Sequence, residues 1–191
     1  MTAPRILAFA GSLRRDSFNK KLARVAADAA RAAGGEVTYV DLADLRMPIY
    51  DGDLEKAEGI PPEAKRFKEL MLANDALIIA SPEYNSSIPG TLKNVLDWVS
   101  RSEQGEPPLA AYAGKVGIFM SASPGPWGAI RSLGLLRMML GNIKVLVLPD
   151  FVSIARAGEA FNPDGSLKDA KQAAAVQKLG KTLTDTLAKL K

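Results

Sequence analysis

Short apolar runs alternate with longer amphipathic segments along most of this 191-residue chain, and this alternation limits its possible folds most strongly. Strands that alternate with helices pair in parallel through right-handed crossovers, so that helices cover both faces of the sheet. The pattern therefore predicts an α/β fold, with irregular connections at 45–62 and 102–114. The predicted strands are Arg5–Ala10, Val37–Asp41, Ala76–Ser81, Val116–Ser121 and Lys144–Leu148. The predicted helices are Asn19–Ala33, Pro62–Ala73, Pro89–Arg101, Ala129–Leu140 and Leu167–Leu190.

Five strands in this rhythm fit a three-layer, doubly wound, flavodoxin-like sheet of parallel strands in the order 2-1-3-4-5. We predict that residues 1–191 form one such domain, since the sequence shows no internal repeat. Ligands bind these sheets outside the carboxyl ends of the strands, where the strand order reverses between the first and third strands. Three polar loops, 11–19, 81–90 and 121–128, would meet at this point.

The first of these loops has the composition of an anion site. Gly11 permits a tight exit from the strand, and the following helix directs its free N–H groups into the loop. Ser12 and Ser17 offer hydroxyl groups, Asn19 an amide and Arg14 a positive charge, which together suit a terminal phosphate. The alternative is an ordinary turn in which Ser17 only caps the helix and Arg14 lies in solvent. The loop lacks the glycine pattern of nucleoside-triphosphatases and of dinucleotide-binding folds.

The second loop looks suited to a planar ring. Pro82 fixes the backbone as it leaves the strand, and Glu83, Tyr84 and Asn85 offer backbone N–H groups beside one aromatic face. The alternative is a plain turn with Tyr84 packed on the surface and Pro89 starting the next helix. We interpret Glu83 as a surface or intersubunit charge rather than as a general base.

The composition excludes several kinds of chemistry. The chain has neither cysteine nor histidine, which rules out disulfides, thiolate nucleophiles and Ser-His-Asp catalysis and leaves few ways to hold zinc. We find no acidic cluster after a strand to hold another metal, so an enzyme with this sequence would rely on a cofactor for its chemistry.

The charge is localised, and no targeting segment is visible. Segment 166–191 holds six lysines and two aspartates, and the rest of the chain is neutral, so the net charge of +4 belongs to the last helix. We interpret these lysines as a solvated helix face rather than a nucleic-acid site, because no aromatic residues lie among them. With no long apolar stretch and no secretory signal, we expect a cytoplasmic protein without membrane contact.

Two motifs give the chain a family resemblance. The first loop reads G-S-x-R-x-x-S-x-N and the second reads P-E-Y-N-x-x-x-P-G-x-x-K-N. Together they resemble the NADPH-dependent FMN reductase family, which includes quinone, chromate and azo-dye reductases, and the likeness spans roughly Arg5 to Phe151. By this resemblance, the FMN phosphate would be held by Ser12, Arg14, Ser17 and Asn19. The isoalloxazine ring would be lined, largely through backbone groups, by Pro82, Glu83, Tyr84 and Asn85, with Ser121 and Ser123 where the family's third loop touches the flavin.

The resemblance implies FMN as cofactor and NAD(P)H as cosubstrate in a ping-pong reaction. NAD(P)H would pass a hydride to flavin N5 and leave, and a small oxidised acceptor would take its place: a quinone, chromate, an azo compound, a ferric chelate or free flavin. No protein residue is assigned a catalytic role, because the flavin carries the chemistry. Arg101 and Arg131 are candidates to bind a 2′-phosphate of the nucleotide. The alternatives are a flavodoxin-like electron carrier without NAD(P)H turnover and a non-enzymatic nucleotide-binding module.

The helix predicted at 129–140 suggests self-association. Its apolar residues point in nearly every direction around the axis, whereas a helix that only covers a sheet needs one apolar stripe. We therefore expect a homodimer or homotetramer, as in members of the family. The alternative is a helix buried beneath the last helix and the loops.

Overall fold

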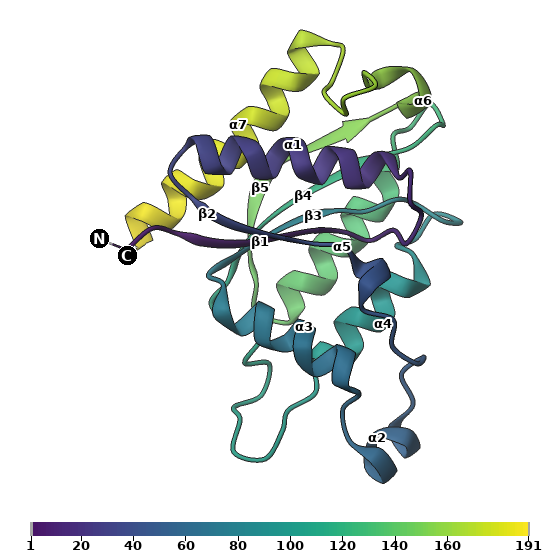
Figure 1. Cartoon of the computed structure of the whole chain (residues 1–191), viewed down its shortest axis with the longest axis vertical. Helices are drawn as coiled ribbons and strands as arrows, with labels where there is room; N and C mark the ends of the chain where they lie inside the picture. The colour runs from purple at the N-terminus through teal and green to yellow at the C-terminus, as the bar shows by residue number, and fades with distance from the viewer. Residues whose placement is uncertain (1, 191) are drawn as a thin grey trace.

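The computed structural model describes residues 2–190, which are organised around a parallel sheet (Figure 1). The strands of this sheet, within residues 2–190, are β1 (Arg5–Ala10), β2 (Glu36–Val40), β3 (Ala76–Ala80), β4 (Val116–Ala122) and β5 (Leu146–Ile154). They are ordered β2-β1-β3-β4-β5, and every neighbouring pair runs parallel. The predicted strand order and direction are confirmed.

Helices cover both faces of the sheet, which confirms the three layers. Helices α1 and α7 pack on one face and α3, α4 and α5 on the other. Figure 1 shows α1 and α7 above the sheet with α3 and α4 below it. The helices are α1 (Phe18–Ala32), α2 (Gly52–Glu58), α3 (Pro62–Ala73), α4 (Gly90–Val99), α5 (Ile130–Asn142), α6 (Ala157–Ala160) and α7 (Ala170–Leu190), with a 3-10 turn η1 (Leu42–Asp44).

Strand β1 shows why its residues form a central strand. Successive side chains point to opposite faces, so Ile6 and Ala8 join the core under α1 and α7 while Leu7 and Phe9 join the core under the other three helices. All four are fully buried. A strand covered on both faces is therefore apolar along its length rather than alternating.

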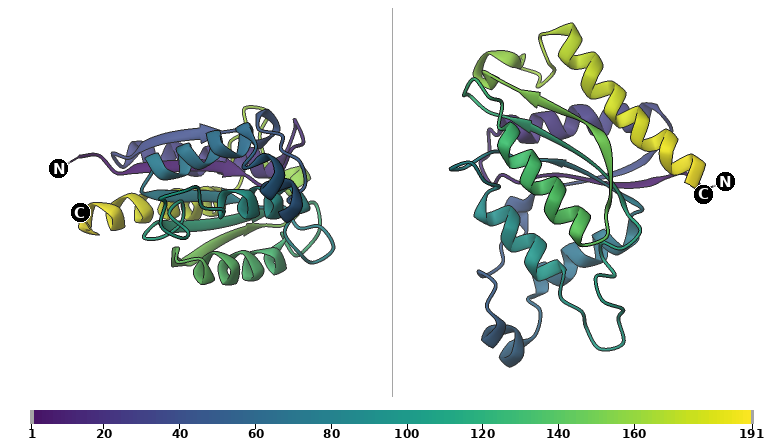
Figure 2. Two further views of the ribbon diagram at one scale, coloured as in Figure 1. Left: turned by 90° about the horizontal axis from the view of Figure 1, so that it is seen from below. Right: turned by 180° about the vertical axis from the view of Figure 1, so that it is seen from behind.

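Strand β5 differs from the prediction. We predicted a strand at Lys144–Leu148 that ends before Pro149, but β5 runs from Leu146 to Ile154. It is an edge strand, and its register with β4 shifts between the pairs at Gly117 and Phe119, so proline is tolerated there. Figure 2 shows β5 at the edge of the sheet between α5 and α7.

The long connection between β2 and α3 is more ordered than predicted. It contains η1 and helix α2, whose first turn is capped by the carboxylate of Asp51, which accepts from Asp53 N at 2.8 Å. None of the residues of α2 is buried, so no apolar periodicity could reveal it. The last helix begins at Ala170 rather than Leu167, because Leu167 forms a β-bridge with Phe161. In residues 2–190 no helix has both the length and the apolar composition needed to cross a bilayer.

Candidate flavin site

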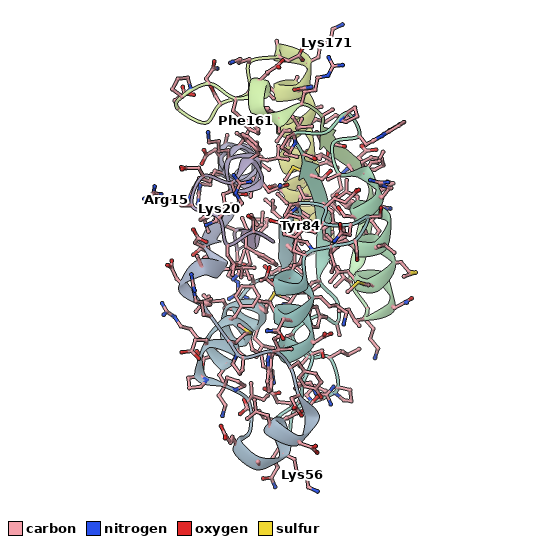
Figure 3. The ribbon with its side chains drawn as sticks, turned by 90° about the vertical axis from the view of Figure 1, so that its right-hand side faces the viewer. Arg15, Lys20, Lys56, Tyr84, Phe161 and Lys171 are labelled. Carbon is pink, nitrogen blue, oxygen red and sulfur yellow. The ribbon has the colours of Figure 1, made fainter. Side chains whose placement is uncertain are left out.

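The three polar loops meet at the carboxyl edge of the sheet, where the chain leaves β1 for α1 on one face and leaves β3 for α4 on the opposite face. Figure 3 looks onto this edge, with Tyr84 near its middle and Arg15 projecting away from it. A hollow of about 60 Å³ lies between the loops. It takes in eight of the ten predicted site residues and leaves out Asn85 and Ser121. Its lining is Ser12, Arg14, Ser17, Phe18, Asn19, Pro82, Glu83, Tyr84, Ala122, Ser123 and Pro124.

The first loop leaves donors directed at this hollow. Ser17 stands at the N-cap of α1 and is 5% exposed, yet its hydroxyl makes no capping hydrogen bond. The backbone N–H groups of Phe18, Asn19 and Lys20 also lack an acceptor within residues 2–190. Free N–H groups at a helix N-terminus attract anions through their hydrogens and the helix dipole. A phosphate group would satisfy this cluster of donors without acceptors.

Ser12 and Arg14 of the first loop differ in their contacts. The hydroxyl of Ser12 accepts a hydrogen bond from Arg14 N at 3.3 Å, so it shapes the loop as well as lining the hollow. The Arg14 side chain is exposed and has no carboxylate partner in the described part of the chain. Arg14 is therefore free to turn its charge toward a ligand.

Asn19 does not direct its amide into the loop as predicted. Its Nδ2 donates to Ala122 O at 2.8 Å, and Ala122 N donates to its Oδ1 at 2.9 Å. The side chain is 3% exposed. Asn19 therefore connects the start of α1 to the end of β4 and fixes the first loop against the third, 103 residues away in sequence.

The second loop is a tight hairpin turn. Asn85 and Ser86 have φ values of 51° and 65°, and Tyr84 and Ser87 exchange backbone hydrogen bonds of 3.0 and 3.1 Å. The N–H of Tyr84 is therefore used within the turn, contrary to the prediction that it faces a ligand. Among residues 2–190 the N–H groups of Glu83, Asn85 and Ser86 have no acceptor. The Tyr84 ring is half exposed beside them.

The interpretation of Glu83 as a surface charge is wrong, whereas its interpretation as an intersubunit charge stays a prediction. Its side chain is only 7% exposed and forms an ion pair with Arg131 at the start of α5. Arg131 is thus already paired within the chain. The other candidate for a nucleotide phosphate, Arg101, follows the C-terminus of α4 and pairs with Glu55 at 3.2 Å. It lies at the end of α4 remote from the three loops.

The serine hydroxyl groups of the third loop form hydrogen bonds within that loop. Ser121 is fully buried, and its Oγ donates to Gly128 O at 2.6 Å, so its side chain is not available for the predicted flavin contact. Ser123 Oγ accepts from Gly125 N at 3.2 Å but still lines the hollow. Gly128 has a φ of 60°, and a side chain there would collide with Ser153 and Ala155. The loop is therefore fixed by internal contacts.

A much larger cavity lies elsewhere. It measures about 820 Å³ and lies between the outer face of α1, residues 163–166 and α7. Its charged side chains already have partners, so it offers a ligand little beyond volume. The partners are the Phe161 ring for Lys21, the Tyr39 ring for Arg24, Arg31 for Asp28, Ser166 for Asp164 and Asp185 for Lys181. We therefore place the functional site at the smaller hollow.

Comparisons with known proteins identify the family of this chain. A family model described as NADPH-dependent FMN reductase matches residues 4–159. The chain is 37% identical over 179 residues to an NAD(P)H-dependent FMN reductase of Pseudomonas aeruginosa, covering 91% of this chain and 89% of that one. It is 35% identical over 149 residues to a quinone reductase of Escherichia coli K12, covering 77% and 76% of the two chains.

A solved structure gives the same result. The flavoenzyme NAD(P)H:(acceptor) oxidoreductase of Paracoccus denitrificans superimposes with a TM-score of 0.79 and 30% identity, covering 98% of each chain. The unpaired donors at the start of α1 fit the phosphate end of FMN, and the free N–H groups of the second loop fit the polar edge of a flavin ring. This chain therefore belongs to the NADPH-dependent FMN reductase family, and it is a flavodoxin-like oxidoreductase that uses FMN and NAD(P)H.

Proposed function

We propose that this chain is a ping-pong reductase in which NAD(P)H and a small oxidised acceptor use one site in turn. The observation that carries the proposal is the meeting of three loops at one hollow with donors that lack acceptors. FMN, when bound, supplies the hydride-accepting and electron-donating chemistry. The chain needs no histidine or cysteine for this, since its own task is to bind and orient.

The proposed roles of the residues follow from their unpaired groups. Ser17, Arg14 and the first turn of α1 bind the phosphate, and Ser12 shapes the loop that carries them. The N–H groups of Glu83, Asn85 and Ser86 bind the edge of the ring. Pro82 and Tyr84 border the ring, and Ser123 contacts it from the third loop, with all three lining the hollow. Ser121 and Asn19 position these elements through their contacts within the chain.

We propose a quinone as the preferred acceptor class, because several similar proteins bear the name quinone reductase. Free flavin comes second, and chromate and azo compounds follow. Initial rates with NADPH and each acceptor at matched concentrations test this order. Turnover of quinone at least tenfold faster than of chromate or an azo dye is expected. A faster rate with chromate or the dye would overturn it.

Steady-state rates with both substrates varied test the shared site. Parallel double-reciprocal lines are expected, because NADP⁺ or NAD⁺ must leave before the acceptor enters. Intersecting lines would show that both substrates are bound together and would contradict the ping-pong scheme.

The alternative of an electron carrier without NAD(P)H turnover has a direct test. Anaerobic mixing of the flavin-loaded protein with NADPH should bleach the flavin absorbance within seconds. Absorbance that stays unchanged with both NADPH and NADH would favour the carrier. The named reductases among the similar proteins support the enzyme.

We propose that the chain forms a homodimer or homotetramer through α5. Leu133 and Leu136 of this helix are buried against the sheet, whereas Ile130, Leu135 and Met138 are exposed. Because α5 lies at the surface, burial beneath the last helix does not explain these residues. Light scattering at micromolar concentration should give a multiple of the monomer mass, and Met138→Glu should lower it. A monomer mass for the unaltered protein would contradict the proposal.

A cytoplasmic location also stays a prediction, which cell fractionation tests.

A further inference from the structure

Helix α5 begins without a cap from its own sequence. Its N-cap residue, Ala129, has a φ of 68° and carries no side chain that could accept a hydrogen bond. The first N–H groups of a helix need acceptors, and serine, threonine, aspartate or asparagine usually supplies them. Ile130 N donates to Trp127 O at 3.2 Å, so it is the next N–H groups of α5 that need an acceptor from elsewhere in the chain.

Glu83 supplies this acceptor from the second loop. Its Oε2 accepts from Arg131 N at 3.1 Å and from Ser132 N at 3.2 Å. Its Oε1 accepts from Arg131 Nε at 2.8 Å and pairs with the outer guanidinium nitrogen at 2.5 Å. A carboxylate at a helix N-terminus is stabilised by the N–H groups and the helix dipole. One buried side chain thus caps α5 and neutralises Arg131.

The position of Glu83 links this cap to the flavin site. Glu83 lines the hollow, and its own backbone N–H is one of the free donors of the second loop. The helix that it caps follows directly on the third loop. The carboxylate therefore fixes the second loop against the end of the third, as Asn19 fixes the first against the third.

We propose that Glu83 is a positioning residue that holds two loops of the flavin site together and cancels the charge of Arg131 beside the flavin. This inference rests on the proposed placement of FMN in the three loops. The flavin takes up electrons, so a nearby uncompensated cation favours its reduced form and an uncompensated anion opposes it. Glu83 thereby sets the reduction potential through the ion pair without exchanging a proton with substrate.

The test compares Glu83→Gln, Arg131→Gln and the double variant. Glu83→Gln leaves the Arg131 cation unpaired, so the midpoint potential of bound FMN should rise. Arg131→Gln leaves the carboxylate unpaired, so the potential should fall, and the double variant should return close to the starting value. The matched control is Lys93→Gln, which breaks an exposed ion pair with Asp97 on α4 and should leave the potential unchanged. Spectroelectrochemical titration measures all four variants.

Opposite shifts are a result that a merely structural role would not give. If both single variants shift the potential in the same direction, or neither shifts it, the inference is overturned. The dissociation constant for FMN should rise about tenfold in Glu83→Gln, which corresponds to the loss of one charge-assisted hydrogen bond. An unchanged constant would count against the positioning role.

Hydrogen exchange of the flavin-free protein separates this inference from the proposed function. Glu83→Gln should speed the exchange of the N–H groups of Arg131 and Ser132, and Lys93→Gln should not. Unchanged exchange would overturn the capping role whether or not FMN binds. If the unaltered protein takes up no FMN, the proposed function fails, and with it the role of Glu83 in the potential.

Discussion

The first and third loops of the site both contain serines, but they use them in opposite ways. Ser17 in the first loop is nearly buried and makes no capping hydrogen bond. Ser121 in the third loop is fully buried and donates to Gly128 O at 2.6 Å. The Ser17 hydroxyl stays available to a ligand at the hollow, whereas the Ser121 hydroxyl is used within its own loop. The first loop therefore has groups that can bind a ligand, whereas the third loop has groups that stabilise its own conformation.

Unpaired donors also distinguish the hollow at the three loops from the groove between α1 and α7. That groove is more than ten times larger than the hollow, yet its charged groups are paired within the chain. Unpaired donors therefore indicate the site better than volume does. Substitutions in the first and third loops test whether their side chains have these different roles.

The largest effect is expected for Asn19→Ala, which removes the connection between the two loops. The buried N–H and C=O groups of Ala122 would lose their partners, so the free energy of unfolding should fall by about 2–4 kcal/mol. Urea denaturation measures this value. Asn142→Ala, at an exposed position at the end of α5, is the control and should change it by less than about 0.5 kcal/mol. Equal effects of the two variants would contradict the role of Asn19.

Ser17→Ala should give the next largest effect, and on binding rather than stability. Its hydroxyl makes no capping hydrogen bond, so the free energy of unfolding without FMN should change by less than about 1 kcal/mol. A hydrogen bond to a charged phosphate is worth about 1.5–3 kcal/mol, so the FMN dissociation constant should rise by about 10- to 100-fold. Flavin fluorescence titration measures this change. An unchanged constant would mean that Ser17 does not contact the phosphate.

Ser121→Ala should show the reverse pattern with the smallest effect. Gly128 O would keep its hydrogen bond from Ser153 Oγ at 2.9 Å, so unfolding should become easier by only about 1 kcal/mol. The FMN dissociation constant should change by less than about threefold, because the hydroxyl faces the loop and not the hollow. A tenfold loss of FMN affinity without a loss of stability would show that Ser121 contacts the flavin after all.

Local sequence patterns predicted the fold and the edge of the sheet at which the candidate loops meet. The parallel sheet was predictable from the order of the elements and from the apolar strands that begin at Arg5 and Ala76. A strand buried on both faces is apolar along its whole length, which a sequence shows directly. The loops at Ser12 and Pro82 could be assigned to one edge, since the carboxyl ends of parallel strands share it. The residue types in those loops predicted an anion and a planar ring.

Side-chain partners distant in sequence could not be predicted. Glu83 and Arg131 are 48 residues apart, and Asn19 and Ala122 are 103 apart, so no local pattern reveals either contact. An alanine at the N-cap of α5 is the one signal that could have pointed to a cap from outside. Strand β5 continued through Pro149 because an edge strand tolerates an irregular register: residues 148–150 have no paired position in β4, and this depends on the place of β5 in the sheet.

The most direct test of the flavin site is to titrate the flavin-free protein with FMN and with riboflavin, which lacks the phosphate, and to follow flavin fluorescence. The three-loop site predicts saturation at one FMN per chain and binding of riboflavin at least about 100-fold weaker, because the donors at the start of α1 would lose their charged partner. Equal affinity for the two flavins, or no uptake of either, would contradict it.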